Sequence, residues 1–196
     1  RVSRAERFGL NDRMYEVEFY PTLRPGTYGF ASFGMSSQET LYPQYRVAAD
    51  LYQSLGKGVE ASFGFRRLGF TAATDIYVGT LTKYVGNWML TAKAFSVPDL
   101  EGPEDSISYH AVVRRYVRGD GESFLGLGYS RGYSREELGD RAELQQLGAD
   151  TYRANAELLF GARYVVAATA STSRQERAAR STLWQHSFGA SLTVLF

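Results

Sequence analysis

The sequence lacks cysteine and is poor in histidine and proline: its 196 residues include no Cys, 2 His and 5 Pro. Without thiols the chain can form neither a disulfide scaffold nor a thiolate metal site, and two histidines make a structural zinc site unexpected. The net charge is only +1, from 22 Lys and Arg against 21 Asp and Glu, so no basic surplus exists to neutralise phosphates. We therefore expect no metal, no cofactor and no nucleic-acid partner.

Long apolar runs and an N-terminal export signal are also missing. No stretch of about 18 consecutive apolar residues occurs, so a transmembrane helix is not expected. Residues 1–7 are polar and lack the apolar centre of a signal peptide, which suits a numbering that starts inside a longer precursor. No phosphate-loop pattern appears, and the Gly126-Leu127-Gly128 run lies in an alternating segment with no helix after it.

The chain is instead rich in aromatic residues and glycine, with 14 Tyr, 12 Phe, 2 Trp and 20 Gly, and its polarity alternates with period two. Helical periodicity is nearly absent, and the one candidate, residues 135–146, has no apolar stripe. Turn signals such as Gly56-Lys57-Gly58 separate the alternating segments. The pattern predicts about twelve strands, near residues 2–9, 12–21, 26–35, 42–55, 57–68, 71–84, 87–97, 106–118, 122–131, 144–157, 161–172 and 181–196.

The length and composition of these strands favour a membrane barrel over a soluble sandwich. Many exceed the five or six residues usual in soluble sheets and reach the roughly 9–11 residues that span a membrane. The apolar faces are rich in alanine, which suits lipid contact because lipid does not require interlocking side chains. Tyr and Trp lie toward the strand ends, as in an interfacial girdle, at Tyr45, Tyr84, Trp88, Tyr129 and Trp184.

The connections alternate in length, which is typical of outer-membrane barrels. Short turns alternate with longer polar links at residues 36–41, 98–106, 132–143 and 172–180. An even number of strands also lets a sheet close without edges. We therefore predict an all-β fold: one antiparallel transmembrane β-barrel domain over residues 1–196, located in the bacterial outer membrane, with short periplasmic turns and longer extracellular loops.

The C-terminal segment has apolar residues at every second position up to the last residue, at Phe188, Ala190, Leu192, Val194 and Phe196. This resembles the C-terminal signal of bacterial outer-membrane barrels, an alternating strand closed by a terminal Phe, which the barrel assembly machinery reads. The resemblance assigns an assembly role to Phe188, Leu192, Val194 and Phe196. The alternative is an ordinary amphipathic strand at the end of a domain.

Several runs in the middle of the chain are similar to those of a known family. They are LYPQYR at residues 41–46, GFRRL at 64–68, DIYVGT at 75–80, KYVGNW at 83–88 and RRYV at 114–117. Together they resemble the YaiO-type outer-membrane barrel, over roughly residues 10–135, and KYVGNW is the most specific. Relatives of this barrel type occur in phage-adsorption and exopolysaccharide-secretion systems. The resemblance therefore implies an outer-membrane barrel and, more loosely, export or surface handling of a polysaccharide.

Alternation places a set of charged and tyrosine residues on one face of the predicted strands, which in a barrel is the lumen. These lumen candidates are Glu16, Glu18, Arg46, Asp50, Tyr52, Glu60, Arg66, Asp75, Tyr77, Lys83, Lys93, Arg114, Tyr116, Arg153 and Arg163. One interpretation is a structural network in which opposite charges neutralise one another. The other is a conduit or groove for a saccharide, in which the basic residues would suit an anionic glycan.

Two further observations bear on activity and partners. Ser108 and His110 share a strand face that points inward, whereas membrane hydrolases place such a pair on the lipid face, so we expect no catalytic residue; a lipid-modifying enzyme is the least favoured alternative. His186 alternates with the lipid-facing residues of its strand. Arg115 does so too, although it is charged, and we expect it near the periplasmic rim or at a register shift.

Expected partners are outer-membrane lipid, the barrel assembly machinery, a saccharide and a periplasmic or inner-membrane glycan-synthesis protein. An anchoring barrel without a pore is the main alternative.

Overall fold

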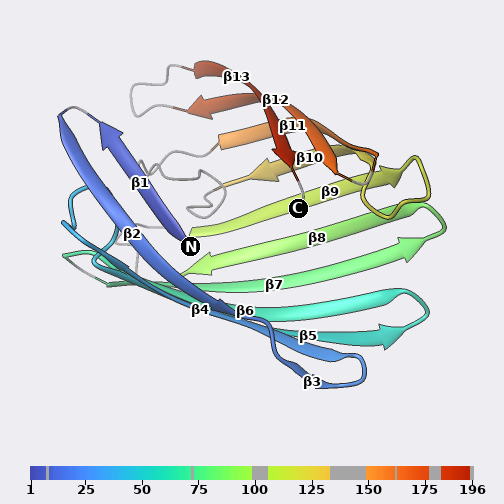
Figure 1. Ribbon diagram of the computed structural model, residues 1–196, viewed down its shortest axis with the longest axis horizontal. Coiled ribbons are helices and arrows are strands. Elements are labelled where there is room, and N and C mark those ends of the chain that lie inside the picture. The colour runs from blue at the N-terminus through green and yellow to red at the C-terminus, as the bar shows by residue number, and fades with distance from the viewer. Residues whose placement is uncertain are drawn as a thin grey trace. The chain divides into compact units, whose positions relative to one another are not determined.

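The computed structural model describes residues 1–7, 9–71, 73–98, 106–132, 149–161, 163–176 and 182–194. Within these residues the regular structure is β-strand alone (Figure 1). The described part of the chain holds no helix with the length and apolar character needed to cross a membrane. The strands are β1 (Val2–Arg7), β2 (Leu10–Phe19), β3 (Thr22–Arg24), β4 (Thr27–Ser36), β5 (Tyr45–Gly56), β6 (Val59–Gly69), β7 (Ala73–Val85), β8 (Trp88–Val97), β9 (Ser106–Tyr116), β10 (Phe124–Arg131), β11 (Ala149–Phe160), β12 (Tyr164–Glu176) and β13 (Thr182–Val194).

The strands follow one another in a single antiparallel order, β1-β2-β4-β5-β6-β7-β8-β9-β10-β11-β12-β13, and β3 pairs with β4 beside this path. Twelve of the thirteen correspond to the twelve predicted strands. The additional strand, β3, exists because the chain leaves the β2 ladder at Pro21, which has no N–H to donate. The carbonyl oxygen of Pro21 instead accepts a hydrogen bond from the Gly29 N–H at 2.8 Å.

Two predicted boundaries near the C-terminus are wrong. The strand predicted at residues 144–157 is β11, which continues beyond the predicted end to Phe160; the predicted start at residue 144 lies outside the described residues. The link predicted at residues 172–180 is mostly strand, because β12 continues to Glu176. The polar sequence around Thr172 and Ser173 favours a loop. In the structure, however, these residues pair with Tyr152 and Thr151 on β11, and this pairing keeps them extended.

The chain divides into two compact units, which are described separately. Among the described residues, unit 1 holds those within 1–80 and 94–107, and unit 2 holds those within 81–93, 108–132 and 149–194. In unit 1 the polar face of the sheet is buried and the apolar face is exposed: Glu16 and Asp50 are 5% and 9% exposed, whereas Val17 and Phe63 are 56% and 62% exposed. Soluble domains show the opposite pattern.

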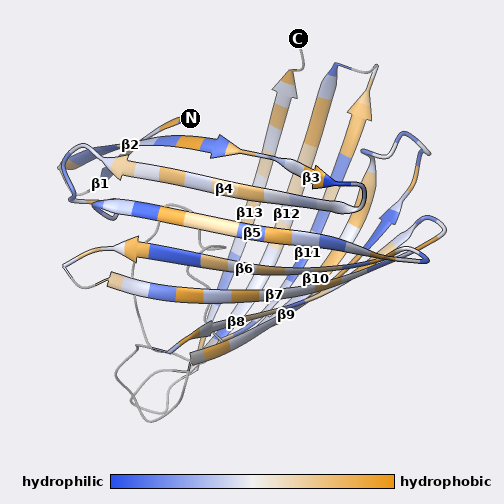
Figure 2. Ribbon diagram, turned by 90° about the horizontal axis from the view of Figure 1, so that it is seen from below, coloured by the Kyte–Doolittle hydropathy of each residue, from blue (hydrophilic) through white to orange (hydrophobic). Residues whose placement is uncertain are grey.

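The same inversion holds in unit 2, and Figure 2 shows hydrophilic and hydrophobic residues alternating along the strands. Ser108 is fully buried and His110 is 9% exposed, while Leu125 and Leu127 are 51% and 68% exposed. We call the face that carries Glu16 and Asp50 in unit 1, and Ser108 and His110 in unit 2, the charged face of each unit. The opposite face, with Phe63 or Leu127, is the apolar face.

A small apolar core does lie on the charged face of unit 1. Ile76 and Val78 of β7 pack with Phe95 and Val97 of β8, and Leu68 of β6 borders them. The long strands, which reach 13 residues in β7, β12 and β13, match the length predicted for membrane crossing. The first and last strands of the order are β1 and β13.

Candidate functional site

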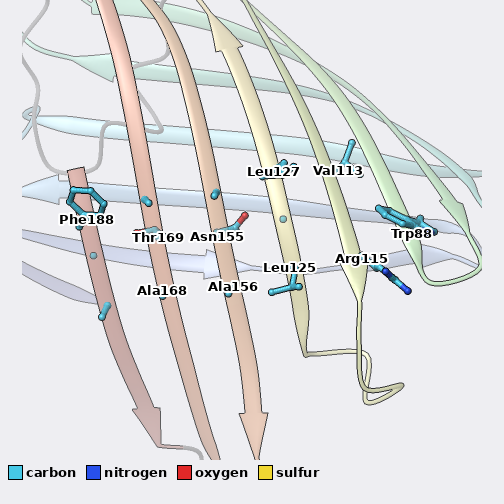
Figure 3. A pocket seen from close by; sticks show the side chains of 15 residues that line it. Trp88, Val113, Arg115, Leu125, Leu127, Asn155, Ala156, Ala168, Thr169 and Phe188 are labelled. Atoms are coloured by element: carbon cyan, nitrogen blue, oxygen red, sulfur yellow. The ribbon is translucent and has the colours of Figure 1, made fainter. Parts of the chain in front are cut away.

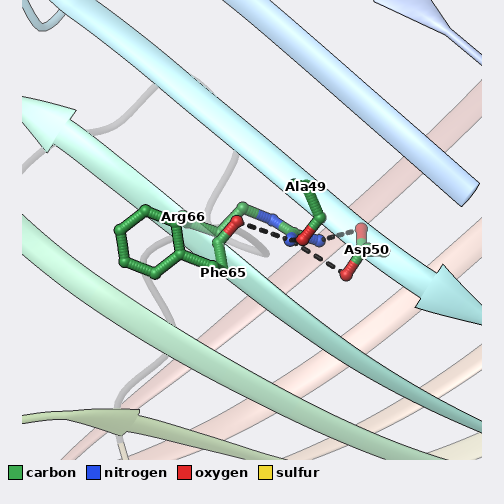
Figure 4. Close-up of polar contacts among 4 residues, drawn as sticks. All are labelled: Ala49, Asp50, Phe65 and Arg66. Carbon is green, nitrogen blue, oxygen red and sulfur yellow. Dashed lines mark hydrogen bonds and ion pairs between the residues drawn. The ribbon is translucent and has the colours of Figure 1, made fainter.

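The charged face of unit 1 is built around two ion pairs, one of which is shown in Figure 4. Arg66 of β6 donates hydrogen bonds to both carboxylate oxygens of Asp50 on β5, with Nη2 2.7 Å from Oδ2 and Nη1 2.9 Å from Oδ1. The two side chains are only 12% and 4% exposed. In the second pair, Arg46 Nε lies 2.9 Å from Glu16 Oε1, and the Glu16 side chain is 3% exposed. Both pairs join residues predicted to face the lumen.

Glycines leave the space that these ion pairs occupy. Gly34 of β4 stands in register between Glu16 of β2 and Arg46 of β5, so the pair reaches across an entire strand. A Cβ at Gly34 would lie 3.0 Å from Arg46 Cγ. Gly64 is opposite Asp50, and a Cβ there would collide with Asp50 Oδ1. Gly34 and Gly64 therefore lie at crowded positions on this face, where a larger residue would displace an ion-paired side chain.

Tyrosines and acids form a second cluster on the charged face of unit 1, toward the short turns. The rings of Tyr28 and Tyr52, a cross-strand pair, stack with centroids 4.7 Å apart and planes 3° apart. Tyr28 Oη donates to Glu60 Oε2 at 2.7 Å. Tyr20 Oη donates to Glu18 Oε2 at 2.8 Å, and this hydrogen bond raises the pKa of the Tyr20 hydroxyl. We call these five residues the tyrosine–acid cluster.

The prediction that Tyr77 faces the lumen is wrong. On β7, Ile76 and Val78 are each 3% exposed and occupy the buried face, so Tyr77 between them points the other way. Its ring lies 6.4 Å from Phe63 and 5.5 Å from Phe65, both on the apolar face. β7 has apolar residues on both faces here, so sorting its residues by polarity chose the wrong one.

The predictions that Asp75 and Lys83 face the lumen are also wrong, for the same reason as the prediction for Tyr77. Asp75 pairs with Arg67, with Arg67 Nε 3.3 Å from Asp75 Oδ1, and Arg67 lies on the face opposite Arg66. Lys83 follows Thr82, whose hydroxyl lies 3.1 Å from that of Thr91 on the buried side. Lys83 therefore points to the apolar face.

Unit 2 contributes a more basic set to its own charged face. The predicted residues found there are Lys93, Arg114, Tyr116 and Arg153. The Arg114 guanidinium lies 4.5 Å from the centroid of the Phe124 ring, and Arg153 is in register with Gly128. Arg163 is a correction, because it lies in the turn between β11 and β12 and its N–H closes that turn onto Phe160 O at 3.3 Å.

Ser108 and His110 point to the charged face, as predicted from their parity. Ser108 Oγ is buried and makes no hydrogen bond within the described residues. A serine nucleophile needs its base within hydrogen-bonding reach, and these two side chains do not make that contact. In the same described part of the chain, no group of three His, Cys, Asp or Glu is placed to hold a metal ion.

Sequence reasoning missed Asp12, which organises the link between β4 and β5. The Asp12 side chain is fully buried, and its Oδ1 accepts a hydrogen bond from Ser36 Oγ at 2.7 Å. Both of its oxygens also accept backbone N–H groups of the link at 3.0–3.1 Å, from Gln38, Thr40, Leu41 and Tyr42. The local pattern holds no signal for this role, because Asp12 and Tyr42 meet only when β2 and β5 pair on either side of β4.

The predicted assembly residues lie on the apolar face of β13. Phe188 is 85% exposed and in register with Ala170, while Leu192 and Val194 pair with Val166 and Tyr164. Phe196 lies outside the described residues. The assembly role itself stays a prediction.

A sheet of long antiparallel strands that buries ion pairs on one face and exposes apolar side chains on the other is typical of membrane β-barrel proteins. The family model of the YaiO membrane beta barrel domain matches residues 1–137. The chain belongs to this family, as the runs in its middle predicted. No curated protein and no solved structure matches it.

Proposed function

We propose that the chain closes into a barrel in the bacterial outer membrane and takes part in the export or surface handling of a polysaccharide. Membership of a membrane barrel family and the exposed apolar faces support the location. Closure would join β1 to β13 and remove the two free edges, which a bilayer does not tolerate. The proposal includes recognition of β13 by the barrel assembly machinery and delivery of the glycan by a periplasmic or inner-membrane partner.

The observation that carries the polysaccharide role is the tyrosine–acid cluster. Stacked rings present flat apolar surfaces, and carboxylates accept hydrogen bonds, and sugars use both. The cluster is accessible, since Tyr28 is 39% exposed and Tyr20 is 70% exposed. It lies beyond the ion pairs of Asp50 and Glu16, toward the turns that the proposal places in the periplasm. A glycan entering from that side would meet it first.

The test is conductance across a planar bilayer, with oligosaccharides added on the side of the short turns. We expect a steady channel whose current falls on addition of the oligosaccharide that fits. A panel of neutral, amine-bearing and uronic-acid oligomers identifies the charge class. Tyr28→Ala should weaken the block about tenfold, because it removes the flat apolar ring surface that a sugar would cover, and a tenfold change corresponds to about 1.4 kcal/mol of lost apolar contact.

Tyr77→Ala is the matched control, since it removes a tyrosine from the apolar face of the same unit. Equal weakening by both variants would contradict the proposal. A closed barrel without saccharide response would instead support the second candidate, a barrel that anchors a periplasmic partner. The ion pairs favour that candidate, because the buried Asp50–Arg66 pair and the pair of buried Glu16 with Arg46 neutralise charge on this face. We further propose that the chain has no catalytic activity; unchanged lipid and glycan turnover after Ser108→Ala and His110→Ala would agree, and a loss would contradict it.

A further inference from the structure

A groove of about 900 Å³ crosses the apolar face of unit 2 (Figure 3). Leu125 and Leu127 of β10 form one wall, and Phe188 of β13 forms the other. A second hollow of about 590 Å³ shares Leu127 and Phe188 with it and continues to Tyr129 and Tyr152. The two hollows join along the strands, and we refer to both together as the groove.

The strand register explains why the face is hollowed here. Leu127 stands in a row with Ala154, Ala170 and Phe188 across four neighbouring strands. Leu125 begins a second row in which the next three residues are Ala156, Ala168 and Ala190. The methyl groups of β11 and β12 therefore form a low floor along the leucines of β10. On the β13 side this floor is bordered by Phe188 in the first row and is open at Ala190 in the second, and the groove is parallel to the strands. A membrane-spanning strand tilts by only about 35–45°, so such a groove follows the direction of lipid chains.

Arg115 of β9 lines the groove near one end, next to Leu125 and on the side of Leu125 away from the alanine floor. It is exposed on the apolar face, in register with Leu125, and its guanidinium lies 5.5 Å from the centroid of the Trp88 ring. The structure gives it no ion pair with any described residue. A cation on a lipid-facing surface is costly unless it reaches the interface or an anion. A guanidinium binds phosphate through two parallel hydrogen bonds, and a tryptophan beside it marks the depth of lipid headgroups.

We propose that the groove holds an acyl chain of one glycerophospholipid molecule whose phosphate binds Arg115. The inference rests on the membrane location in the proposed function. The turn that follows Arg115, residues 117–123, is one of the short connections, so the headgroup belongs to the periplasmic leaflet, where the lipids are phospholipids. The alanine floor admits the chain, the leucines and Phe188 flank it, and Arg115 sets its depth.

The experiment measures retained lipid by native mass spectrometry on the protein extracted from outer membranes in mild detergent. The variants are Arg115→Gln, which removes the charge, and Ala170→Leu, which fills the floor. Matched controls are Arg131→Gln and Ala92→Leu, which change exposed residues outside the groove. Stripped protein is then titrated with phosphatidylglycerol, or with diacylglycerol of the same chains, which lacks the phosphate.

We expect wild type and both controls to retain one phospholipid per chain. Arg115→Gln and Ala170→Leu should retain at least about tenfold less, the loss expected for a charge-assisted contact. Wild type should bind phosphatidylglycerol in preference to diacylglycerol, and Arg115→Gln should abolish that preference. Equal retention in all variants would overturn the inference. A protein dimer without bound phospholipid would also overturn it, because a second copy of the chain would then cover the groove in place of a lipid.

Membrane fractionation of the same cells separates this failure from failure of the proposed function. Protein recovered in the outer membrane but without selective lipid retention overturns the lipid site alone. Protein recovered outside the outer membrane overturns both. Folding of each variant is checked by its shift on a gel between heated and unheated samples, which does not depend on the lipid.

Discussion

The Asp50–Arg66 ion pair makes a sharp prediction about stability. Asp50→Asn keeps the shape of the side chain but removes the carboxylate charge that the Arg66 guanidinium binds through two hydrogen bonds, on a face where the Arg66 side chain is 12% exposed. Removing one partner of a buried pair costs about 3–5 kcal/mol, because an uncompensated charge remains. Removing both partners should cost less than the sum of the two single losses.

The measurement is the free energy of unfolding in urea, with the chain folded into lipid vesicles and followed by tryptophan fluorescence. The variants are Asp50→Asn, Arg66→Gln and their combination. Arg67–Asp75 is the matched control, since its atoms lie 3.3 Å apart and Arg67 is 48% exposed. Arg67 is two residues from the end of β6 at Gly69, where a long side chain reaches the water at the membrane surface, so breaking this pair should cost below about 1 kcal/mol. Equal losses in the two pairs, or strict additivity for Asp50 and Arg66, would refute the reasoning.

The glycine beneath this pair provides a second way to disturb it. Gly64→Ala places a Cβ on Asp50 Oδ1 and should destabilise the protein by about 1–3 kcal/mol. Gly79→Ala is its control, because no atom lies within 4 Å of the added Cβ. Asp50→Ala combined with Gly64→Ala should cost less than the sum of the two single changes. Additive losses would contradict a direct clash between the Cβ added at position 64 and the Asp50 side chain.

Three further predictions concern single positions. Asp12→Ala should leave the backbone of the β4–β5 link without its acceptors, cost on the order of 2–3 kcal/mol and open that link to protease; unchanged cleavage would contradict this. Gly69→Ala should displace the ring of Tyr45, which a Cβ would meet, and lower the thermal midpoint. Hydrogen bonds from Ser123 hold the pKa of Asp120 below its ordinary value, so the turn gains stability above that ordinary value and loses it as pH falls through the lower folded-state pKa. Amide exchange of Ser123 should rise over that acidic window and lose its pH dependence in Asp120→Asn.

Local alternation was enough to predict most of the strands. Twelve were placed near their observed positions because period two is a property of the extended chain itself and needs no partner. The exceptions have tertiary causes. The register with β11 keeps Thr172 extended, and the departure of Pro21 from the β2 ladder creates β3.

Alternation also assigned most of the charged residues to the correct face, including Asp50 and Arg66. It failed at Asp75, Tyr77 and Lys83, because β7 carries apolar side chains on both faces and polarity does not tell them apart. The side chain of Ile76 is buried on the charged face, so its neighbours Asp75 and Tyr77 must point to the apolar face. Burial is a property of the assembled sheet. No periodicity within one strand reports it.

The sequence by itself determined that this chain is β-structured, which residues alternate along most strands, and to which family it belongs, since each depends on neighbours along the chain. The tertiary structure decided which side chains meet. Glu16 reaches Arg46 because Gly34 lies in register between them, and Asp12 holds a link some thirty residues away in the chain. The lipid-sized groove likewise exists only where the register aligns alanines on neighbouring strands. Contacts between strands depend on register, and register is set by the whole sheet rather than by any one segment.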